Sequence, residues 1–428
     1  MYLTKEEERM LKGEYGSGVQ KSMEIIVSLG DVMGAERMIK SACSHIWSYG
    51  LQGFGDVSKW NREFEMKLLE EVEHFRIPTT INPKFMKIER ADLCKKLGLS
   101  KSLVEDIRRS MRWNIEKYEE LGAIPTYSCT PFFMHPVRKG EHLTASESVA
   151  VIMYNSVYGA TVNRETQPTA LSSAITGRTP EFGMHMPENR YGRVLFKLDD
   201  DLDPKKFTYA DYSTLGYYVG KIAMDRNVIF EGIPKNVTVA QLKSFMAPLG
   251  VSGAVCLAHI VGVTPEALTL KDALVDKKPE EEVIVEKKEL IETRDSLSTA
   301  KEEEVNAVVF GCPHATLEEV KDIAHLIKGR KVKNGVILLI GVPETVRVLA
   351  ERMGFVNIIE GSGGFVVSDM CPGTEIFSRE GQEIGVHNIT TNCSKCAHYT
   401  VGHSAGKINA WFGDAKACID TAVKGKWD

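Results

Sequence analysis

Hydrophobic residues in the C-terminal half gather into short unbroken runs, most of them followed by a segment with helical periodicity. Segments 305–310, 335–341 and 365–367 carry no charged residue, which is typical of strands covered on both faces. Thr316 and Glu319 form a capping box after the first run. Strands that alternate with helices in this way predict a doubly wound sheet with mainly parallel strands, whose ligands bind at the carboxyl ends of the strands.

The N-terminal half shows a less regular pattern of helices and short strands. Thr4 and Glu7 form a capping box in front of a short helix. A longer helical pattern from 19 to 42 contains Leu29-Gly30-Asp31, where we expect a break. Further helices are predicted at 60–73 and 103–121, and short strands at 77–82 and 124–127.

The centre of the chain combines apolar strands with a charge-dense stretch. Strands are predicted at 228–230 and 254–263, with a capping box at Thr238 and Gln241 between them. The charge of 271–304 would fit a solvated linker, but 283–297 has the pattern of an exposed strand and helix. We expect two regions, namely 1–225, an α/β region with the wall of a substrate site, and 226–428, a doubly wound α/β region.

The segment from Thr144 to Arg193 is unusually rich in polar and small residues. Such a stretch packs poorly as a simple core, because each buried polar group must find a hydrogen-bond partner. We interpret it as the wall of a site.

Composition narrows the class of protein. The 53 Lys and Arg against 58 Asp and Glu give a net charge of −5, which disfavours binding to a nucleic acid backbone. The apolar runs are shorter than the ~18 residues a membrane span needs, and the N-terminus lacks a secretory pattern. We therefore expect a cytoplasmic protein without a membrane partner, whose odd number of cysteines leaves metal binding or catalysis open.

Three cysteines occupy comparable positions after predicted strands. Cys312 lies two residues past one strand and just before a helix, Cys371 follows another strand, and Cys129 follows the short strand at 124–127. A thiolate near a helix N-terminus is stabilised by the helix dipole, which suits a metal ligand. Each cysteine taken alone could also be a small buried hydrophobic residue, whereas three at such junctions favour a metal site.

A second candidate is Cys393-Ser394-Lys395-Cys396, followed closely by His398. Two thiolates at this spacing can hold one metal ion or cluster, and the same spacing occurs in redox motifs. The remaining cysteines lie in apolar periodic stretches and are expected in the core, namely Cys43, Cys94, Cys256 and Cys418.

Several basic residues could bind an anionic ligand. Arg164, Arg178 and Arg190 could hold a carboxylate or phosphate with two hydrogen bonds, and Lys395 could bind phosphate as a point charge. Each could equally belong to an ordinary surface ion pair or be a solvated cation. The chain lacks a P-loop, a GxSxG elbow and an HExxH helix.

Taken together, a set of motifs resembles the aconitase X family along nearly the whole chain. They are Leu3-Thr4-Lys5-Glu6-Glu7-Glu8, Gly13-Glu14, Ser44-His45-Ile46, Asn82-Pro83, Cys129-Thr130-Pro131, Glu147-Ser148, Tyr154-Asn155-Ser156, Gly159-Ala160, Asn163-Arg164, Ala174-Ile175-Thr176-Gly177, Glu188-Asn189-Arg190, Gly262-Val263-Thr264-Pro265-Glu266-Ala267, Gly311-Cys312-Pro313-His314 and Ala397-His398-Tyr399. The resemblance implies aconitase-like α/β/α layers with mainly parallel sheets.

The resemblance implies an iron–sulfur hydro-lyase. The archaeal type has two chains, a large subunit of this kind and a small swivel-like subunit, and together they convert (R)-mevalonate 5-phosphate to trans-anhydromevalonate 5-phosphate in isoprenoid synthesis. A fused bacterial type dehydrates cis-3-hydroxy-L-proline. Because the chain ends soon after Ala397-His398-Tyr399, we expect the large subunit of the two-chain type, with the other substrate as an alternative. A thiol redox protein or a zinc-stabilised subunit using Cys393 and Cys396 is a further alternative.

The resemblance also implies which residues form the site. Cys129, Cys312 and Cys371 would hold a 4Fe-4S cluster with one iron open to the substrate hydroxyl. Glu147 would orient the substrate or relay a proton, Lys395 would bind its phosphate or carboxylate, and a serine of the small subunit would be the base. Further substrate contacts are expected at Ser48, Tyr49, Gly50, Asn82, Pro83, Glu147, Ser148, Asn163, Arg164 and Lys395. Trp47-Ser48-Tyr49-Gly50 replaces the Ser-Gly-Val-Ser type of sequence that is usual in the family, and Cys393 and Cys396 are additions to its pattern.

Overall fold

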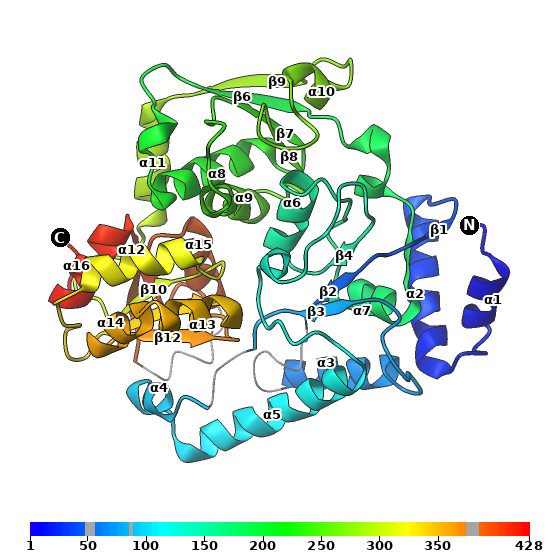
Figure 1. Ribbon diagram of the computed structural model, residues 1–428, viewed down its shortest axis with the longest axis horizontal. Helices are drawn as coiled ribbons and strands as arrows, with labels where there is room; N and C mark the ends of the chain where they lie inside the picture. Colours follow the sequence, from blue (N-terminus) through cyan, green and yellow to red (C-terminus); the bar gives the residue numbers. More distant parts are fainter. Residues whose placement is uncertain (48–55, 85–88, 374–384) are drawn as a thin grey trace.

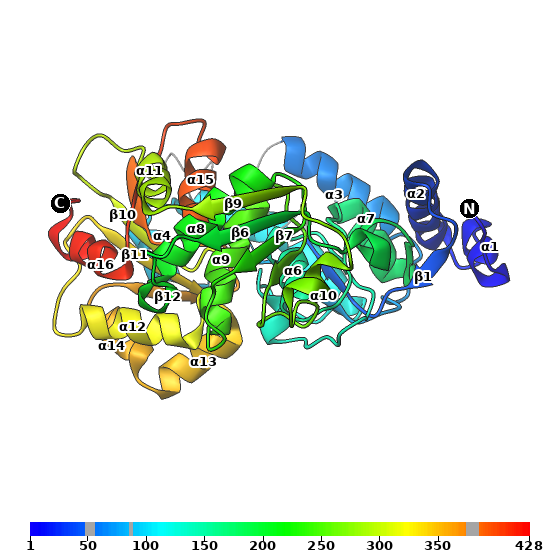
Figure 2. The same ribbon diagram turned by 90° about the horizontal axis from the view of Figure 1, so that it is seen from above.

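The structure is a computed structural model that describes residues 1–47, 56–84, 89–373 and 385–428 of the 428-residue chain. Three α/β regions follow one another along the sequence, with the N-terminal helices at one end of the molecule and the C-terminal region at the other (Figures 1 and 2). Most strand pairs in the described residues are parallel, so the predicted fold class is confirmed. No helix in these residues combines the length and the apolar character needed to cross a bilayer.

The C-terminal region is built on a five-stranded parallel sheet in the order β12-β11-β10-β13-β14. Its strands are β10 (Ala307–Phe310), β11 (Ile337–Val342), β12 (Phe365–Ser368), β13 (Asn388–Thr391) and β14 (Asn409–Phe412). Its helices are α12 (Leu317–Ile327), α13 (Glu344–Arg352), α14 (Phe355–Gly361), α15 (Ser394–His403) and α16 (Ala415–Lys424). The strand order reverses between β10 and β13, and a ligand crevice is expected at the carboxyl ends of strands at such a point.

A four-stranded parallel sheet in the order β8-β7-β6-β9 forms the middle region. Its strands are β6 (Val194–Leu198), β7 (Val228–Glu231), β8 (Ala258–Ile260) and β9 (Glu281–Val285). Its helices are α8 (Tyr209–Ala223), α9 (Val239–Ser252), α10 (Leu270–Leu274) and α11 (Lys287–Leu297). Helices α8 and α9 pack closely, because Gly216 allows the two backbones to approach. Strand β9 and helix α11 correspond to the exposed strand and helix expected within 283–297. The boundary between two regions after residue 225 stays a prediction.

The N-terminal region holds a three-stranded parallel sheet, β3-β2-β4, and an antiparallel pair, β1-β5. The strands are β1 (Met38–Lys40), β2 (Ser44–Ile46), β3 (Thr79–Ile81), β4 (Thr144–Ala145) and β5 (Arg178–Pro180). The helices are α1 (Lys5–Leu11), α2 (Ser17–Met33), α3 (Asp56–Leu68), α4 (Ala91–Lys96), α5 (Lys101–Glu120), α6 (Ser148–Ser156) and α7 (Gln167–Thr176). Short 3-10 turns occur at Pro131–Phe133, Gly183–His185, Pro187–Asn189 and Pro204–Lys206.

One hydrophobic core connects the first and third regions. It contains Ile46 and Leu171 from the N-terminal sheet and helices together with Val309 and Leu339 from the C-terminal sheet, all at most 2 % exposed. A second core fills the space between α6, α8, α9 and the middle sheet. The first and third regions therefore share one hydrophobic core.

Three local predictions for the N-terminal half are wrong. Helix α2 continues through Leu29-Gly30-Asp31, and glycine is needed at position 30 because Met1 and Pro180 pack so close to the helix that a side chain would not fit. The helical pattern expected to reach residue 42 ends at Met33, where Gly34 takes the left-handed conformation, and Met38–Lys40 form β1 instead. The expected strand at 124–127 is reduced to a single bridge between Thr80 and Ile124.

Candidate active site

A cavity of about 270 Å³ opens where loops of the first and third regions meet. Nine of the residues predicted for the site line it, namely Asn82, Pro83, Cys129, Glu147, Ser148, Arg164, Cys312, Cys371 and Lys395. The polar segment that begins at Thr144 contributes part of the wall, as expected. The sequence motifs, which are far apart in the chain, thus meet in one place.

The two C-terminal cysteines of this cavity follow parallel strands of one sheet. Cys312 comes two residues after β10, and Cys371 three residues after β12. Gly311 has φ of +85°, and a side chain there would overlap the carbonyl of Gly341. Glycine therefore allows the tight turn that brings Cys312 to the strand end.

Two of the three cysteine thiols, those of Cys129 and Cys312, have pKa values raised by their surroundings. Burial raises the pKa of Cys129 to about 12. Contact with Cys371 lowers the pKa of Cys312, but contact with Cys396 and burial outweigh it, and the resulting pKa lies well above the ordinary value. These thiols are neutral without a bound cation, whereas a metal ion removes the proton from a thiol that coordinates it.

The donor set fits an iron–sulfur cluster better than a single ion. Nowhere in the described residues do three His, Cys, Asp or Glu side chains converge closely enough to hold one metal ion. Cys129, Cys312 and Cys371 instead line the cavity together, and no disulfide joins any cysteine in the described ranges. A polynuclear cluster binds one thiolate on each of several irons, so three thiols around a cavity suit it.

Lys395 and Glu147 form a buried ion pair in the cavity wall. Lys395 Nζ lies 2.7 Å from Glu147 Oε1 and donates to Ser148 Oγ at 3.3 Å. The two charged side chains are only 6 % and 10 % exposed. Burial by itself lowers the pKa of Lys395, but the negative charge of Glu147 overrides it, and the pKa lies well above its ordinary value. Lys395 is therefore a permanent cation in the wall.

Glu147 is fixed by the helix that it begins. It is the N-cap of α6, and its Oε2 accepts from the backbone N–H groups of Val149 and Ala150 at 2.5 and 3.1 Å. The positive end of a helix dipole stabilises a carboxylate there. Both carboxylate oxygens are thus engaged, one by the helix and one by Lys395.

Asn82 is oriented by a buried histidine. His45 Nε2 lies 3.3 Å from Asn82 Oδ1, and His45 Nδ1 lies 2.9 Å from Thr80 Oγ1. Burial lowers the pKa of His45 to about 4, so the imidazole is neutral. Asn82 and the adjacent Pro83 therefore present a fixed polar and apolar edge to the cavity.

The structure places the other predicted substrate contacts differently. Arg164 is exposed and lines the cavity. Asn163 does not line the cavity, because its side chain accepts from the backbone N–H of Met184 and donates to the carbonyl of Phe182. Ser48, Tyr49 and Gly50 lie outside the described residues.

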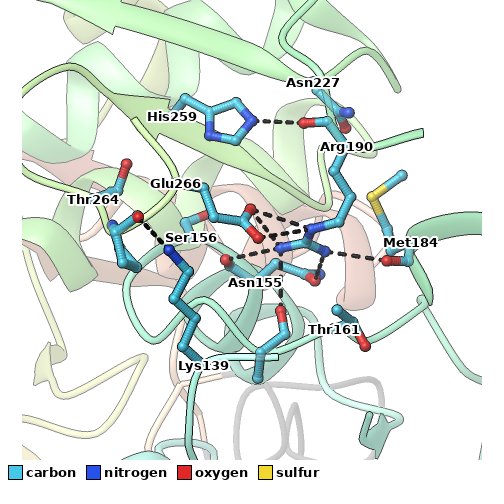
Figure 3. A network of polar contacts seen from close by, with 12 residues as sticks. Lys139, Asn155, Ser156, Thr161, Met184, Arg190, Asn227, His259, Thr264 and Glu266 are labelled. Atoms are coloured by element: carbon cyan, nitrogen blue, oxygen red, sulfur yellow. Dashed lines mark hydrogen bonds and ion pairs between the residues drawn. The ribbon is translucent and has the colours of Figure 1, made fainter. Parts of the chain in front are cut away.

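Two of the three candidate arginines belong to internal ion pairs. Arg178 contacts Glu6 and Glu7 in α1. The guanidinium of Arg190 binds Glu266 and Asn155 Oδ1 and donates to the carbonyls of Asn155, Ala160 and Met184 (Figure 3). Neither arginine lines the cavity, which leaves Arg164 as the candidate anion-binding arginine.

Cys393 and Cys396 lie behind the cavity wall. Cys393 Sγ contacts the carbonyl of Cys312, and Cys396 is 0 % exposed in the shared core. A Cβ at Gly373 would lie 2.7 Å from Cys396 Sγ. His398 contacts the hydroxyl of Tyr217. Neither cysteine of the pair lines the cavity.

Glu165, His314 and Tyr399 also line the cavity, although no role at the site was predicted for these three residues from the sequence. Burial raises the pKa of Glu165 more than its contact with Thr169 lowers it, and Glu165 Oε1 has no hydrogen-bond partner among the described residues. The Tyr399 ring centroid lies 5.8 Å from Lys395 Nζ. His314 and Tyr399 belong to motifs that resemble the aconitase X family, and those motifs could have indicated a place at the site. Glu165 directly follows the Asn163-Arg164 motif, but it is not part of any motif.

The fold and this cavity define a class, an α/β protein with parallel sheets whose loops gather three thiols and a buried lysine–glutamate pair around one pocket. Models of the three aconitase X domains match residues 1–188, 192–295 and 305–424, described as the first, second and third domain. The chain belongs to the aconitase X family.

Its relatives in this family are dehydratases. A phosphomevalonate dehydratase large subunit of Thermococcus kodakarensis is 35 % identical over 93 % of this chain and 95 % of the relative. A cis-3-hydroxy-L-proline dehydratase of Pseudomonas aeruginosa is 29 % identical over 98 % of this chain and 70 % of the relative. The crystal structure of Thermococcus kodakaraensis aconitase X in its holo-form has a TM-score of 0.83 and 32 % identity, covering 99 % of this chain and 100 % of that one.

Proposed function

We propose that this chain is the large subunit of a hydro-lyase that converts (R)-mevalonate 5-phosphate to trans-anhydromevalonate 5-phosphate together with a small subunit. Relatives that carry the name phosphomevalonate dehydratase large subunit reach 35 % identity and match this chain over 93 % of its length, while a cis-3-hydroxy-L-proline dehydratase reaches 29 %. The small subunit is inferred from the words "large subunit" in those names. We place the enzyme in the cytoplasm, where cysteines without disulfides are usual.

The observation that carries this proposal is the convergence of Cys129, Cys312 and Cys371 with Lys395 and Glu147 on one cavity. We assign the three thiols to a 4Fe-4S cluster. When bound, such a cluster supplies a Lewis acid for the substrate hydroxyl, which is otherwise a poor leaving group.

The chain's own residues bind and orient the substrate. The Lys395 ammonium, kept charged by Glu147, binds a phosphate or carboxylate oxygen from inside the wall, and the Arg164 guanidinium does so from the exposed side. Asn82 offers its amide, held by His45, to a hydroxyl or carboxylate. Desolvation makes these contacts stronger than they would be in water.

Dehydration removes the hydroxyl group and also a proton from the neighbouring carbon beside the carboxylate. A base must accept that proton. Both carboxylate oxygens of Glu147 already accept hydrogen bonds, so Glu147 acts by keeping Lys395 charged and in place rather than by removing a proton. We assign the base to a serine of the small subunit. The large subunit alone is then expected to bind substrate without converting it.

The alternatives that place function on Cys393 and Cys396 are weaker. Cys396 is fully buried, and neither thiol lines the cavity. A redox function would need an accessible pair of thiols. A zinc function would need a set of converging ligands, and no group of three His, Cys, Asp or Glu side chains among the described residues could hold one metal ion.

The test is an anaerobic assay of the chain co-purified with its small subunit. We expect dehydration of mevalonate 5-phosphate by the complex, no turnover by the large subunit alone, and little or no turnover of cis-3-hydroxy-L-proline. Turnover of only the hydroxyproline would overturn the substrate assignment. A complex that converts neither substrate although it is loaded with iron would overturn the proposed function.

A further inference from the structure

The three cysteine-bearing loops of the cavity meet at one buried side chain, His314. Its ring Nδ1 lies 2.9 Å from Ser128 Oγ, and its ring Nε2 lies 2.9 Å from the carbonyl oxygen of Met370. Its backbone N–H donates to Cys129 Sγ at 3.3 Å. The residue is 0 % exposed.

The direction of these hydrogen bonds follows from their chemistry. A backbone carbonyl can only accept, so His314 Nε2 carries the ring proton and donates it to Met370 O. Nδ1 of the neutral ring is then an acceptor and receives the hydroxyl proton of Ser128. Both ring nitrogens are committed, which leaves neither available to bind a metal or to take a proton from a substrate.

Each partner of His314 stands next to a proposed cluster ligand. Ser128 precedes Cys129, Met370 precedes Cys371, and His314 itself is two residues after Cys312. The ring thus spans loops that are 186 and 56 residues away in the sequence. A single imidazole is therefore hydrogen-bonded to the residues that precede Cys129 and Cys371, and it lies two residues from Cys312.

The His314 loop is itself anchored from the middle region. Lys243 of α9, which is 1 % exposed, donates to the carbonyl of His314 at 2.8 Å and to Glu319 Oε2 at 2.6 Å. Glu319 Oε2 also accepts from the backbone of Thr316, at the start of α12. The hydrogen bonds at His314 therefore join parts of all three aconitase X domains of the chain.

We propose that His314 is a positioning residue that pre-organises Cys129, Cys312 and Cys371 for cluster binding and slows the loss of the cluster. This inference rests on the proposed function, because it presupposes that the three cysteines hold an iron–sulfur cluster. Residues that orient metal ligands through hydrogen bonds typically change metal affinity by about 10- to 100-fold when removed.

The test measures how fast a ferrous-iron chelator removes the cluster from the anaerobic complex, followed by visible absorbance and by iron and sulfide per chain. His314→Ala removes both ring contacts, His314→Gln retains a donor near the Nε2 position, and His314→Asn retains an acceptor near the Nδ1 position. We expect cluster loss about 10- to 100-fold faster for His314→Ala. The two amide variants should lie between it and the wild type.

A matched control is His259→Gln. His259 is also buried and also contacts a backbone carbonyl, that of Arg190 at 2.6 Å (Figure 3), but it belongs to β8 and does not line the cavity. We expect the wild-type rate for this variant. Ser128→Ala, which removes only the hydroxyl partner, serves if His314→Ala does not fold, and it should also lose the cluster faster than the wild type.

The outcomes separate the two proposals. Wild-type protein without iron would overturn the proposed function and this inference with it. If the wild type holds iron but His314→Ala loses the cluster at the wild-type rate, the inference alone is overturned. Ser128→Ala takes the place of His314→Ala in this comparison if His314→Ala does not fold. An equal acceleration in His259→Gln would also overturn the inference alone, because the effect would then reflect general loosening of the core. A changed electron paramagnetic resonance signal of the chemically reduced cluster in His314→Gln would support the positioning role.

Discussion

Two buried ion pairs of this chain look alike by distance and differ in what surrounds them. Arg190 lies 2.8 Å from Glu266 and Lys395 lies 2.7 Å from Glu147, with the two cations 8 % and 6 % exposed. All five N–H groups of Arg190 have acceptors in the network of Figure 3. Lys395 can donate three hydrogen bonds but makes two in the described part of the chain, and it faces the cavity.

The difference separates a structural ion pair from one that can bind a ligand. A cation whose donors are all used has nothing to offer a substrate, whereas Lys395 still has a donor and lies where a substrate can reach it. Low exposure and a short distance therefore do not by themselves identify an ion pair that binds a ligand. In this chain, the ligand-binding pair is distinguished by a hydrogen-bond donor that has no acceptor among the described residues and by its position beside the cavity.

The largest effect on stability is expected for Arg190→Met. The change leaves Glu266 without its partner and the carbonyls of Asn155, Ala160 and Met184 without a donor. Removing one side of a buried pair costs about 3–5 kcal/mol. Urea unfolding measures this loss. Arg193→Met, which breaks a more exposed pair with Glu280, should cost less than about 1 kcal/mol, and equal losses in the two variants would contradict the distinction.

Lys395→Met should reduce activity strongly and stability less than Arg190→Met does. We expect kcat/KM to fall about 10²- to 10³-fold, because a preorganised cation that contacts the substrate is lost. The stability loss should be smaller than for Arg190→Met, because Glu147 keeps its contacts with the α6 backbone and faces the cavity. Steady-state kinetics and urea unfolding of the same preparation give both values. Lys416→Met, which breaks an exposed pair with Asp420, should leave kcat/KM unchanged.

Glu147→Gln is expected to change the pH dependence of activity. Burial lowers the pKa of Lys395, and Glu147 is the largest of the contributions that raise it, so its loss should lower that pKa. The ammonium is then lost at a lower pH than in the wild type, so the alkaline limb of the activity profile should shift to lower pH. We also expect kcat/KM at neutral pH to fall about tenfold or more, from the loss of a charge-assisted hydrogen bond. An unchanged alkaline limb of the pH profile would show that Glu147 does not control Lys395.

The smallest effect is expected for Arg164→Met. Arg164 is exposed at the cavity, so its contribution to binding a phosphate is partly screened by water. We expect KM for the phosphorylated substrate to rise about tenfold or less, with kcat nearly unchanged. Arg178→Met, whose side chain already pairs with Glu6 and Glu7, should leave KM as it is, and a rise there instead would reverse the assignment of the two arginines.

Local signals in the sequence predicted much of the fold. The capping boxes at Thr4, Thr238 and Thr316 are all present, because such a box depends on two residues three positions apart. The break expected at Gly30 failed because a glycine inside a helix can be required by a distant neighbour, here Pro180. That neighbour could not be read from the local sequence.

The same limit applies to the site. The cysteines after β10 and β12 could be placed together because parallel strands end at one edge of a sheet. The contacts of His314 with Ser128 and Met370 depend on loops far apart in the chain, so no spacing indicated its position. Arg190 and Arg164 are equally basic, and only the positions of Glu266 and the cavity distinguish them.

The most direct test of the proposed site is the iron and sulfide content of anaerobically prepared protein in Cys312→Ala, with Cys418→Ala as a control. Cys418 is a fully buried thiol in a separate core cluster and should not affect binding. We expect about four irons and four sulfides per chain in the wild type and in Cys418→Ala, and a nearly complete loss in Cys312→Ala. Wild type without iron, or Cys312→Ala with the same content as the wild type, would contradict the assignment of this cavity.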